Sequence, residues 1–276
     1  MTAVLARIRA KVAGRRPLVR KSCARARAAW LLVTAWGLVA CGSDSAGSTV
    51  SPPPAPSGSG APGLSPLGRA RCQAPAGVDA SPKNIDEAVE LLNALPKPTS
   101  VACFVESLAR PLNAYATSSP FSAQPALSPK SPRLFLQLDE LWLSVVIDGD
   151  SSYLMEFGLL IDTQAMRSIK GELKLPLDAP VAPSTPFDRV RYDSGTVCGL
   201  CHLDEHQETS VSFAAAFSSN AFRPRPDSRV GIDGLRLENQ LCDWHAEPHR
   251  CEMLSAVFDG GPVSEIQFPA EMRTFF

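Results

Sequence analysis

Apolar and polar positions recur along the chain with two different periods, which place helices before strands. Residues 84–92 carry apolar side chains at positions 85, 88, 89 and 92. This spacing of three and four predicts a helix of about three turns. Thr99 or Ser100 precedes a second apolar run at 101–108 and would serve as its N-cap. We therefore expect a helical entry over residues 71–112.

From residue 113 the pattern changes to short apolar runs separated by turn residues. Five of these runs predict strands, at 133–138, 141–147, 152–161, 167–177 and 187–192. Asp148-Gly149-Asp150 separates two of them as a hairpin turn. Sequential strands joined by short connections predict an antiparallel β meander within a β-rich stretch, residues 113–193.

The last part of the chain, residues 194–276, combines a predicted helix with most of the sulfur and imidazole side chains. The helix would begin near Pro248 and end before Gly260-Gly261. All four histidines and four of the eight cysteines fall between residues 198 and 251. We expect an α+β fold in a single folded domain, residues 71–276: N-terminal helices, the meander, and then a Cys/His-rich C-terminal subdomain.

The first 40 residues have a composition of their own. They carry nine Lys or Arg and no Asp or Glu, and they end in an apolar run at 28–40. A basic segment followed by a short apolar run is typical of a secretory signal peptide, and the run is shorter than the roughly 20 residues that cross a bilayer. Residues 41–70, rich in Gly, Ser and Pro, predict a flexible tether.

The end of this leader, Leu38-Val39-Ala40-Cys41, resembles the lipobox of bacterial lipoproteins. The resemblance implies cleavage before Cys41 and lipidation of that cysteine. The folded domain would then be anchored to a membrane of the cell envelope, at the outer membrane or on the periplasmic face. An uncleaved anchor and a cleaved signal of a soluble exported protein are the alternatives.

Charge and motifs exclude several classes of function. Beyond residue 40 the chain has 18 basic and 28 acidic side chains, so it lacks the basic surface that nucleic acids require. It also lacks a glycine-rich phosphate loop, a dinucleotide-binding fingerprint and a G-x-S-x-G elbow. An electron carrier or a binding protein fits this composition better than a hydrolase or transferase.

The strongest chemical motif is Cys198-Gly199-Leu200-Cys201-His202. It resembles the haem-attachment motif of c-type cytochromes. The resemblance implies haem c bound by thioethers at Cys198 and Cys201, with His202 as an iron ligand. Such a protein would transfer single electrons to or from a redox protein partner. The second iron ligand would come from Met253, His245 or His249.

Two other roles of the same residues stay open. In an exported protein, six cysteines beyond the leader favour disulfides, pairing Cys72 with Cys103, Cys198 with Cys201 and Cys242 with Cys251. This framework predicts a disulfide-stapled envelope protein with a structural or partner-binding role and no haem. A C-x₂-C pair with distant Cys or His is also compatible with tetrahedral zinc. The histidine pairs 202/206 and 245/249 have the spacing of one helix face.

Overall fold

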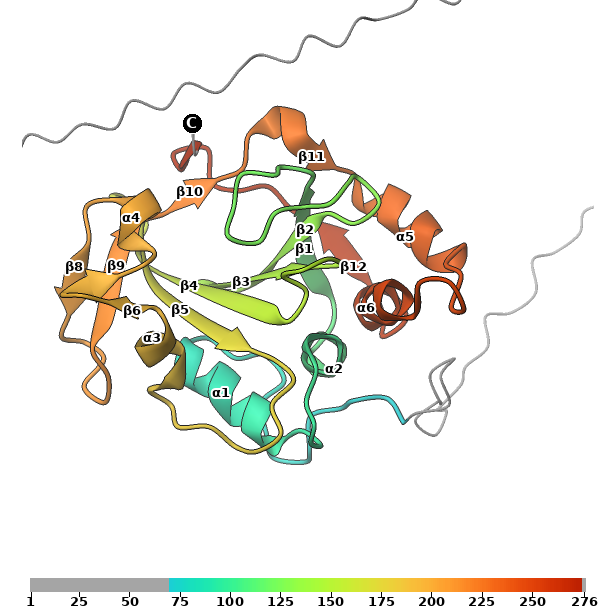
Figure 1. The fold of residues 1–276 in the computed structure, drawn as a ribbon, viewed down its shortest axis with the longest axis horizontal. Helices are drawn as coiled ribbons and strands as arrows, with labels where there is room; N and C mark the ends of the chain where they lie inside the picture. Colours follow the sequence, from blue (N-terminus) through green and yellow to red (C-terminus); the bar gives the residue numbers. More distant parts are fainter. Residues whose placement is uncertain (1–69, 275–276) are drawn as a thin grey trace, which may run out of the picture. The chain divides into compact units, whose positions relative to one another are not determined.

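The structure is a computed structural model that describes residues 70–274. It has the expected α+β fold, with one nine-stranded sheet and helices packed against it (Figure 1). The strands lie in the order β11-β1-β2-β3-β4-β5-β9-β8, and β12 pairs with β1. The bounds of these strands are β1 (Leu112–Thr117), β2 (Arg133–Leu138), β3 (Leu141–Val146), β4 (Leu154–Asp162), β5 (Arg167–Lys174), β8 (His206–Glu208), β9 (Ala216–Asn220), β11 (Arg229–Val230) and β12 (Val263–Glu265).

The helices are short and separated along the chain. They are α1 (Ile85–Ala94), α2 (Val101–Ser107), α3 (Thr185–Arg189), α4 (Gly199–His202), α5 (Ile232–Gln240) and α6 (Pro248–Phe258). Two further strand pairs lie outside the main sheet: β6 (Arg191–Tyr192) with β7 (Gly195–Thr196), and β10 (Phe222–Arg223) with β13 (Arg273–Thr274).

The antiparallel meander is present, but its five strands are β1 to β5. The predicted strand at 187–192 is wrong in its first half: residues 187–189 belong to α3, which buries Pro186 and Phe187 and packs against β5. Only Arg191–Tyr192 form a strand, β6, and it lies outside the main sheet. Phe187 and Val190 are three residues apart, a spacing that suits a helical turn. β1 is almost entirely buried and therefore lacks the alternation that marks a half-exposed strand.

Side-chain caps begin the first two helices, and the cap of the second is one of the two residues predicted for it. The Asn84 side chain accepts a hydrogen bond from the Glu87 amide at 2.9 Å, and it donates one to the Glu87 carboxylate. Ser100 caps α2 by accepting from the Cys103 amide. Each cap satisfies an amide at the helix N-terminus that has no partner within the helix. The helix predicted from Pro248 is also present, as α6.

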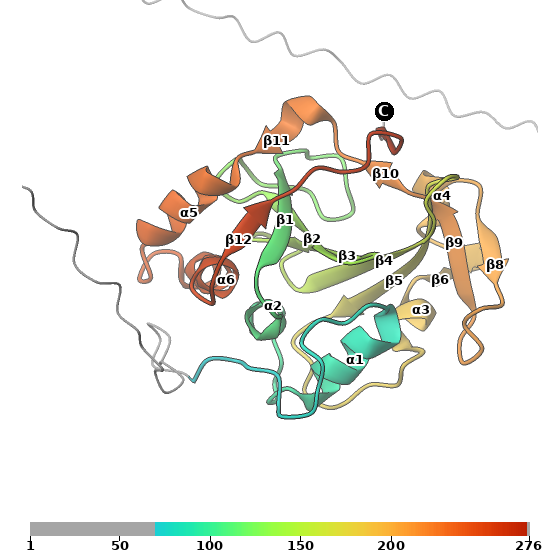
Figure 2. The ribbon, with the colours of Figure 1, turned by 180° about the vertical axis from the view of Figure 1, so that it is seen from behind.

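The two faces of the sheet are covered by different parts of the chain. On one face, inward side chains such as Leu134 and Leu136 form the main core with residues of α1, α2 and α6. Figure 2 shows these helices on one side of the strands. Because side chains alternate along a strand, Arg133 and Phe135 face the other way. That second face is only partly covered, by segments from the C-terminal part of the chain.

Phe268 is the centre of this second layer. Its ring stacks on Trp142 with centroids 4.5 Å apart, and it meets Tyr115 and Phe135 edge-on at 5.0 and 5.1 Å. Such contacts add to the stabilisation that burial of the rings provides. Met272 is buried in the same cluster. The C-terminal third is thus integrated into the domain, and it also supplies four strands of the main sheet.

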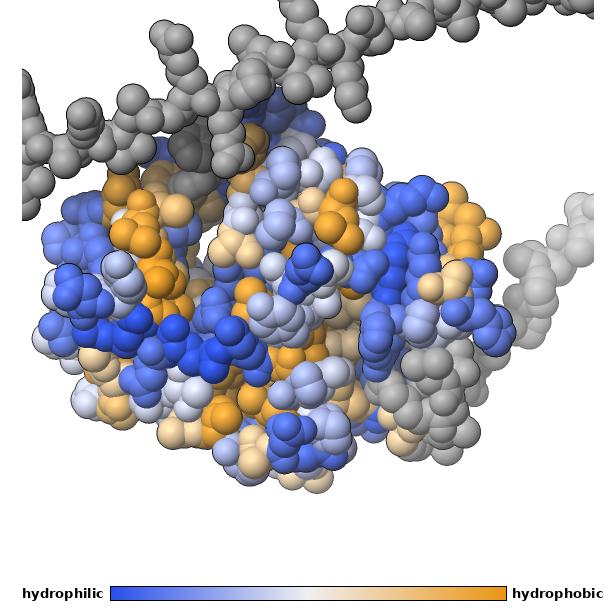
Figure 3. Space-filling model, viewed as in Figure 1, coloured by the Kyte–Doolittle hydropathy of each residue, from blue (hydrophilic) through white to orange (hydrophobic). Residues whose placement is uncertain are grey.

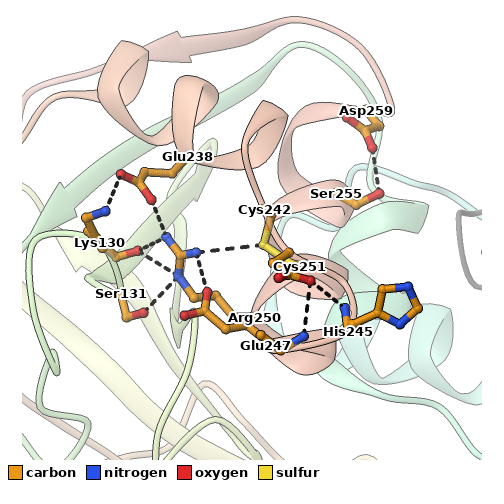
Figure 4. The surroundings of a disulfide bond; sticks show 12 residues. Lys130, Ser131, Glu238, Cys242, His245, Glu247, Arg250, Cys251, Ser255 and Asp259 are labelled. Atoms are coloured by element: carbon orange, nitrogen blue, oxygen red, sulfur yellow. Dashed lines mark hydrogen bonds and ion pairs between the residues drawn. A yellow bond between two sulfur atoms is a disulfide. The ribbon is translucent and has the colours of Figure 1, made fainter.

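Two of the predicted disulfides are present, Cys72–Cys103 and Cys242–Cys251. The first ties the start of the described chain to α2. The second lies beside Arg250, whose buried side chain donates to Ser131 Oγ and to the carboxylates of Glu238 and Glu247 (Figure 4). Arg250 thereby joins α6, α5 and the loop before β2, which explains how a buried charge is tolerated there.

Within residues 70–274, no helix combines the length and the apolar character needed to cross a membrane. The predicted signal peptide, Cys41 and the tether lie outside the described residues.

Replacing both Cys72 and Cys103 by serine is expected to lower the free energy of unfolding by about 4 kcal/mol, since chain entropy scales with the length of the closed loop. The two cysteines are 31 residues apart. Cys242 and Cys251 are 9 apart, so the matching double variant should lose only about 3 kcal/mol. Urea denaturation followed by circular dichroism measures both losses. An equal or larger loss at the shorter loop would contradict this account.

Candidate functional site

A half-open cavity of about 100 Å³ lies on the sheet face that the helices leave uncovered. We call the sheet residues that line it the cavity floor: Arg133 and Phe135 from β2, Trp142 and Ser144 from β3, Glu156, Phe157, Gly158 and Leu160 from β4, and Ser168 and Lys170 from β5. The walls come from α4 and from the C-terminal part of the chain: His202, Ala221, Phe222, Phe268 and Met272.

Gly158 in β4 lies in the middle of the cavity floor. The strand register sets it opposite Trp142 on one side and Lys170 on the other. A Cβ at this position would have only Ser168 Oγ at 3.9 Å and the Trp142 carbonyl oxygen at 4.0 Å as neighbours. Close packing therefore does not demand glycine here. The missing side chain leaves open space between Trp142 and Lys170.

The Cys198–His202 motif forms one short helix, α4, which Glu205 holds in place. The Glu205 carboxylate accepts hydrogen bonds from the Thr196 amide at 2.8 Å and from the Thr196 hydroxyl. A Cβ built on Gly199 would lie 2.7 Å from the Glu205 carboxyl carbon. The carboxylate thus fills the space above the glycine and ties the segment before α4 to the segment after it.

His202 is held in one tautomer. Its Nδ1 lies 2.8 Å from the carbonyl oxygen of Asn220, and a carbonyl can only accept, so Nδ1 carries the proton. In the neutral ring the lone pair is then on Nε2. Burial, together with the charge of Lys170, lowers the pKa of His202 to about 3. The ring, stacked on Phe222, stays neutral at ordinary pH and lines the cavity.

Cys198 and Cys201 do not form the disulfide that one alternative predicts; both are thiols. Cys198 is half-buried, and burial, followed by the charge of Glu156, raises its pKa to about 11. Cys201 is exposed. The surface around them is apolar: hydrophobic side chains gather over α4 in Figure 3, where Leu200 and Leu203 are 67% and 59% exposed.

The other predicted iron ligands lie elsewhere. Met253 is buried in the main core, on α6, which packs against α2 and α5. His245 and His249 are exposed near the start of α6. α4 packs against β7 and β9, and Figures 1 and 2 place α4 and α6 at opposite ends of the sheet. The structure therefore does not bring any of these three residues to His202.

Met272, which the sequence does not single out, lines the same cavity as His202. It is 4% exposed and packs in the cluster around Phe268. It lies in a segment without regular secondary structure just before β13, where no periodicity marks it as inward-facing. Only the fold of the last residues over the sheet reveals its position.

The cavity floor also carries charges that the sequence pattern does not predict to be buried. Arg133 forms an ion pair with Glu156 at 2.5 Å and also donates to Ser144. Lys170 is 8% exposed, and its Nζ donates to Ser168 Oγ and, at 3.4 Å, to the Asn220 carbonyl. Burial lowers the pKa of Lys170 to about 8. Alternation in β5 would turn Lys170 towards solvent, but the second layer covers this face.

Replacing Lys170 by methionine is expected to stabilise the chain at pH 7, by roughly 3 kcal/mol at most. The pKa of Lys170 is about 8 in the folded state against an ordinary 10.5. Below pH 8 both states are charged, and the folded state bears the full cost of burying the ammonium. Between pH 8 and 10.5 the folded state releases its proton first, so the gain should disappear.

Urea midpoints of Lys170→Met and the wild type across pH 7 to 10.5 measure this difference. Lys174→Met, at the exposed end of the same strand, is the control and should show no such pH dependence. A gain that stays constant with pH would contradict the buried charge.

Among residues 70–274, no group of three or more His, Cys, Asp or Glu is arranged to hold a metal ion. The zinc alternative therefore has no ligand set in this part of the chain. Comparisons of the chain with protein-family models, with curated protein sequences and with solved structures found no match.

Proposed function

We propose that the protein is an extracytoplasmic lipoprotein that carries haem c on Cys198 and Cys201 and transfers single electrons. The observation that carries this proposal is the state of His202: one neutral tautomer, held by a backbone carbonyl, on the wall of a cavity next to two thiols. The haem would supply a one-electron redox couple. The chain would supply the attachment, the iron ligand and the surroundings.

The donor set fits this group. Four of the six cysteines in residues 70–274 are consumed by disulfides, and the two that remain as thiols are those of the motif. A histidine that binds a metal usually donates its other ring N–H to a carbonyl or carboxylate, which fixes the ring. Asn220 supports this arrangement at His202. The low pKa of His202 keeps the ring from being protonated instead.

The apolar walls of the cavity suit a haem, and the volume of the cavity suits part of one. Its walls include Phe222, Phe268 and Met272, and the Trp142 ring forms part of its floor. Its volume of about 100 Å³ is below the roughly 300–1,000 Å³ of ordinary ligand pockets. It would enclose only part of a porphyrin. The bonds at Cys198, Cys201 and His202 would therefore provide most of the attachment.

Met272 replaces Met253 as the proposed second iron ligand. Both methionines are buried, but only Met272 lines the cavity together with His202. A thioether ligand raises the reduction potential relative to an imidazole.

The proposed location follows from the leader. Lipidation at Cys41 would hold the tether and domain at the outer membrane or the periplasmic face, where a redox protein partner would exchange electrons with it. Tethering to one surface raises the effective concentration of two such proteins. The acidic composition beyond residue 40 favours a partner with a basic contact surface.

Protein produced together with a haem-attachment system is expected to show a pyridine haemochrome spectrum of covalent haem. Cys198→Ser with Cys201→Ser should abolish it, because no thioether can form. Cys72→Ser with Cys103→Ser is the matched control. The folded fraction of this variant should carry as much haem per chain as the wild type. If the wild type shows no haem band, the disulfide-stapled envelope protein without haem is the better interpretation.

The reduction potential separates the two candidate methionines. Met272→Leu is expected to lower the one-electron potential by at least 59 mV, a tenfold change in the equilibrium constant, because the sulfur ligand is lost. Met253→Leu removes a sulfur from the main core and should leave the potential near that of the wild type. Redox titration followed by absorbance measures both. A lower potential in the Met253 variant alone would return the assignment to that residue.

A further inference from the structure

The ammonium of Lys170 is the one unbalanced charge among the residues that line the cavity. Those residues include two cations, Arg133 and Lys170, and one carboxylate, Glu156. Glu156 lies 2.5 Å from Arg133 and is paired with it. Within residues 70–274, no carboxylate lies at salt-bridge distance from Lys170.

Lys170 also has unused hydrogen-bonding capacity. An ammonium has three N–H donors, and the partners of Nζ in the described chain are Ser168 Oγ and the Asn220 carbonyl. Both are uncharged. A buried ammonium is costly unless an anion accompanies it. Lys170 is 8% exposed and lines the cavity, so the missing anion would have to enter through this space.

The rest of the cavity selects the body of the ligand. Trp142 and Phe268 stack with their planes 14° apart, and Phe135 and Phe222 also line the space. An apolar cavity of about 150 Å³ is known to hold a benzene ring. The space here is smaller, about 100 Å³, but half open, so one six-membered ring close to the cation would enter it with part of the ring outside.

We propose that the cavity binds a carboxylate attached to a flat apolar body, with the carboxylate on Lys170 and the body against the aromatic side chains. This chemistry has two sources, a free aromatic or alicyclic acid and a carboxylate of the group attached at Cys198 and Cys201. Only the second source rests on the proposed function. The ion pair between Arg133 and Glu156 keeps the charge of Arg133 from competing for the ligand.

The whole chain, produced without haem attachment, is titrated with benzoate and with the neutral benzamide by isothermal calorimetry. Benzoate is expected to bind at least tenfold more tightly than benzamide. Lys170→Met should remove this preference and Lys170→Arg should retain it. Lys174→Met, which changes an exposed lysine on the same strand, should bind as the wild type does.

The same titration with haem-carrying protein distinguishes the two sources. Binding of benzoate that persists there identifies a free acid as the ligand. Loss of benzoate binding, together with reduced haem content in Lys170→Met but not in Lys174→Met, identifies the carboxylate of the attached group. If the wild type shows no haem band, the proposed function is refuted. The titration of haem-free protein then decides alone whether a free acid binds.

The proposal is overturned if benzoate binds no better than benzamide to the haem-free wild type and the Lys170→Met protein carries as much haem as the wild type. It is equally overturned if the Lys170→Met and Lys174→Met proteins bind benzoate alike. The urea midpoints of both variants verify that each one is folded when it is tested.

Discussion

The pairing of β1 is the interaction on which the rest of the fold depends. One edge of β1 pairs with β2 along five residue pairs, which starts the meander. The other edge is shared: its first half pairs in parallel with β12, and its end pairs antiparallel with β11. Strands from the last fifty residues are thereby fixed to a strand near the start of the domain. This shared edge acts together with the packing of α6 against α2 and the bond of Arg250 to Ser131 to hold the C-terminal segment on the domain.

The site is a consequence of this topology. The helices that come first in the chain cover one face of the meander and form the larger core. The second face is covered by residues after 200, which form only a thin layer centred on Phe268. A thin cover over an alternating sheet leaves both polar side chains and space beneath it. The cavity floor, with the ion pair of Arg133 and the ammonium of Lys170, is what remains enclosed.

Local chemistry made much of this fold predictable. Asn84 and Ser100 cap helices through their own side chains, and a cap depends on three or four neighbouring residues only. The hairpins of β2 to β4 and the helix starting at Pro248 are likewise local. The Cys72–Cys103 and Cys242–Cys251 pairs were expected from the even number of cysteines beyond a leader that predicts export. Each of these features can be inferred before any tertiary contact is known.

What could not be predicted depends on long-range contacts. β1 carries no alternation because chain segments on both of its faces bury it. The Lys170 side chain lies on the face of β5 that is turned away from the main core. Residues distant in the sequence determine whether that face is exposed to solvent or covered. Met253, and not Met272, is the sulfur donor predicted from the sequence, and the two methionines lie in different parts of the structure. Within the motif, the sequence indicates Cys198, Cys201 and His202 as candidate ligands. It could not indicate the carbonyl of Asn220, which orients His202.

The carboxylate of Glu205 has a consequence for how this chain can vary. It occupies the space that a side chain at Gly195 or Gly199 would need, and its bonds to Thr196 prevent it from swinging away at no cost. A larger residue at either glycine would therefore require either a shorter side chain at position 205 or a displacement of the Glu205 carboxylate. The three positions are therefore energetically coupled: a side chain at either glycine should be tolerated better together with a smaller residue at position 205 than alone.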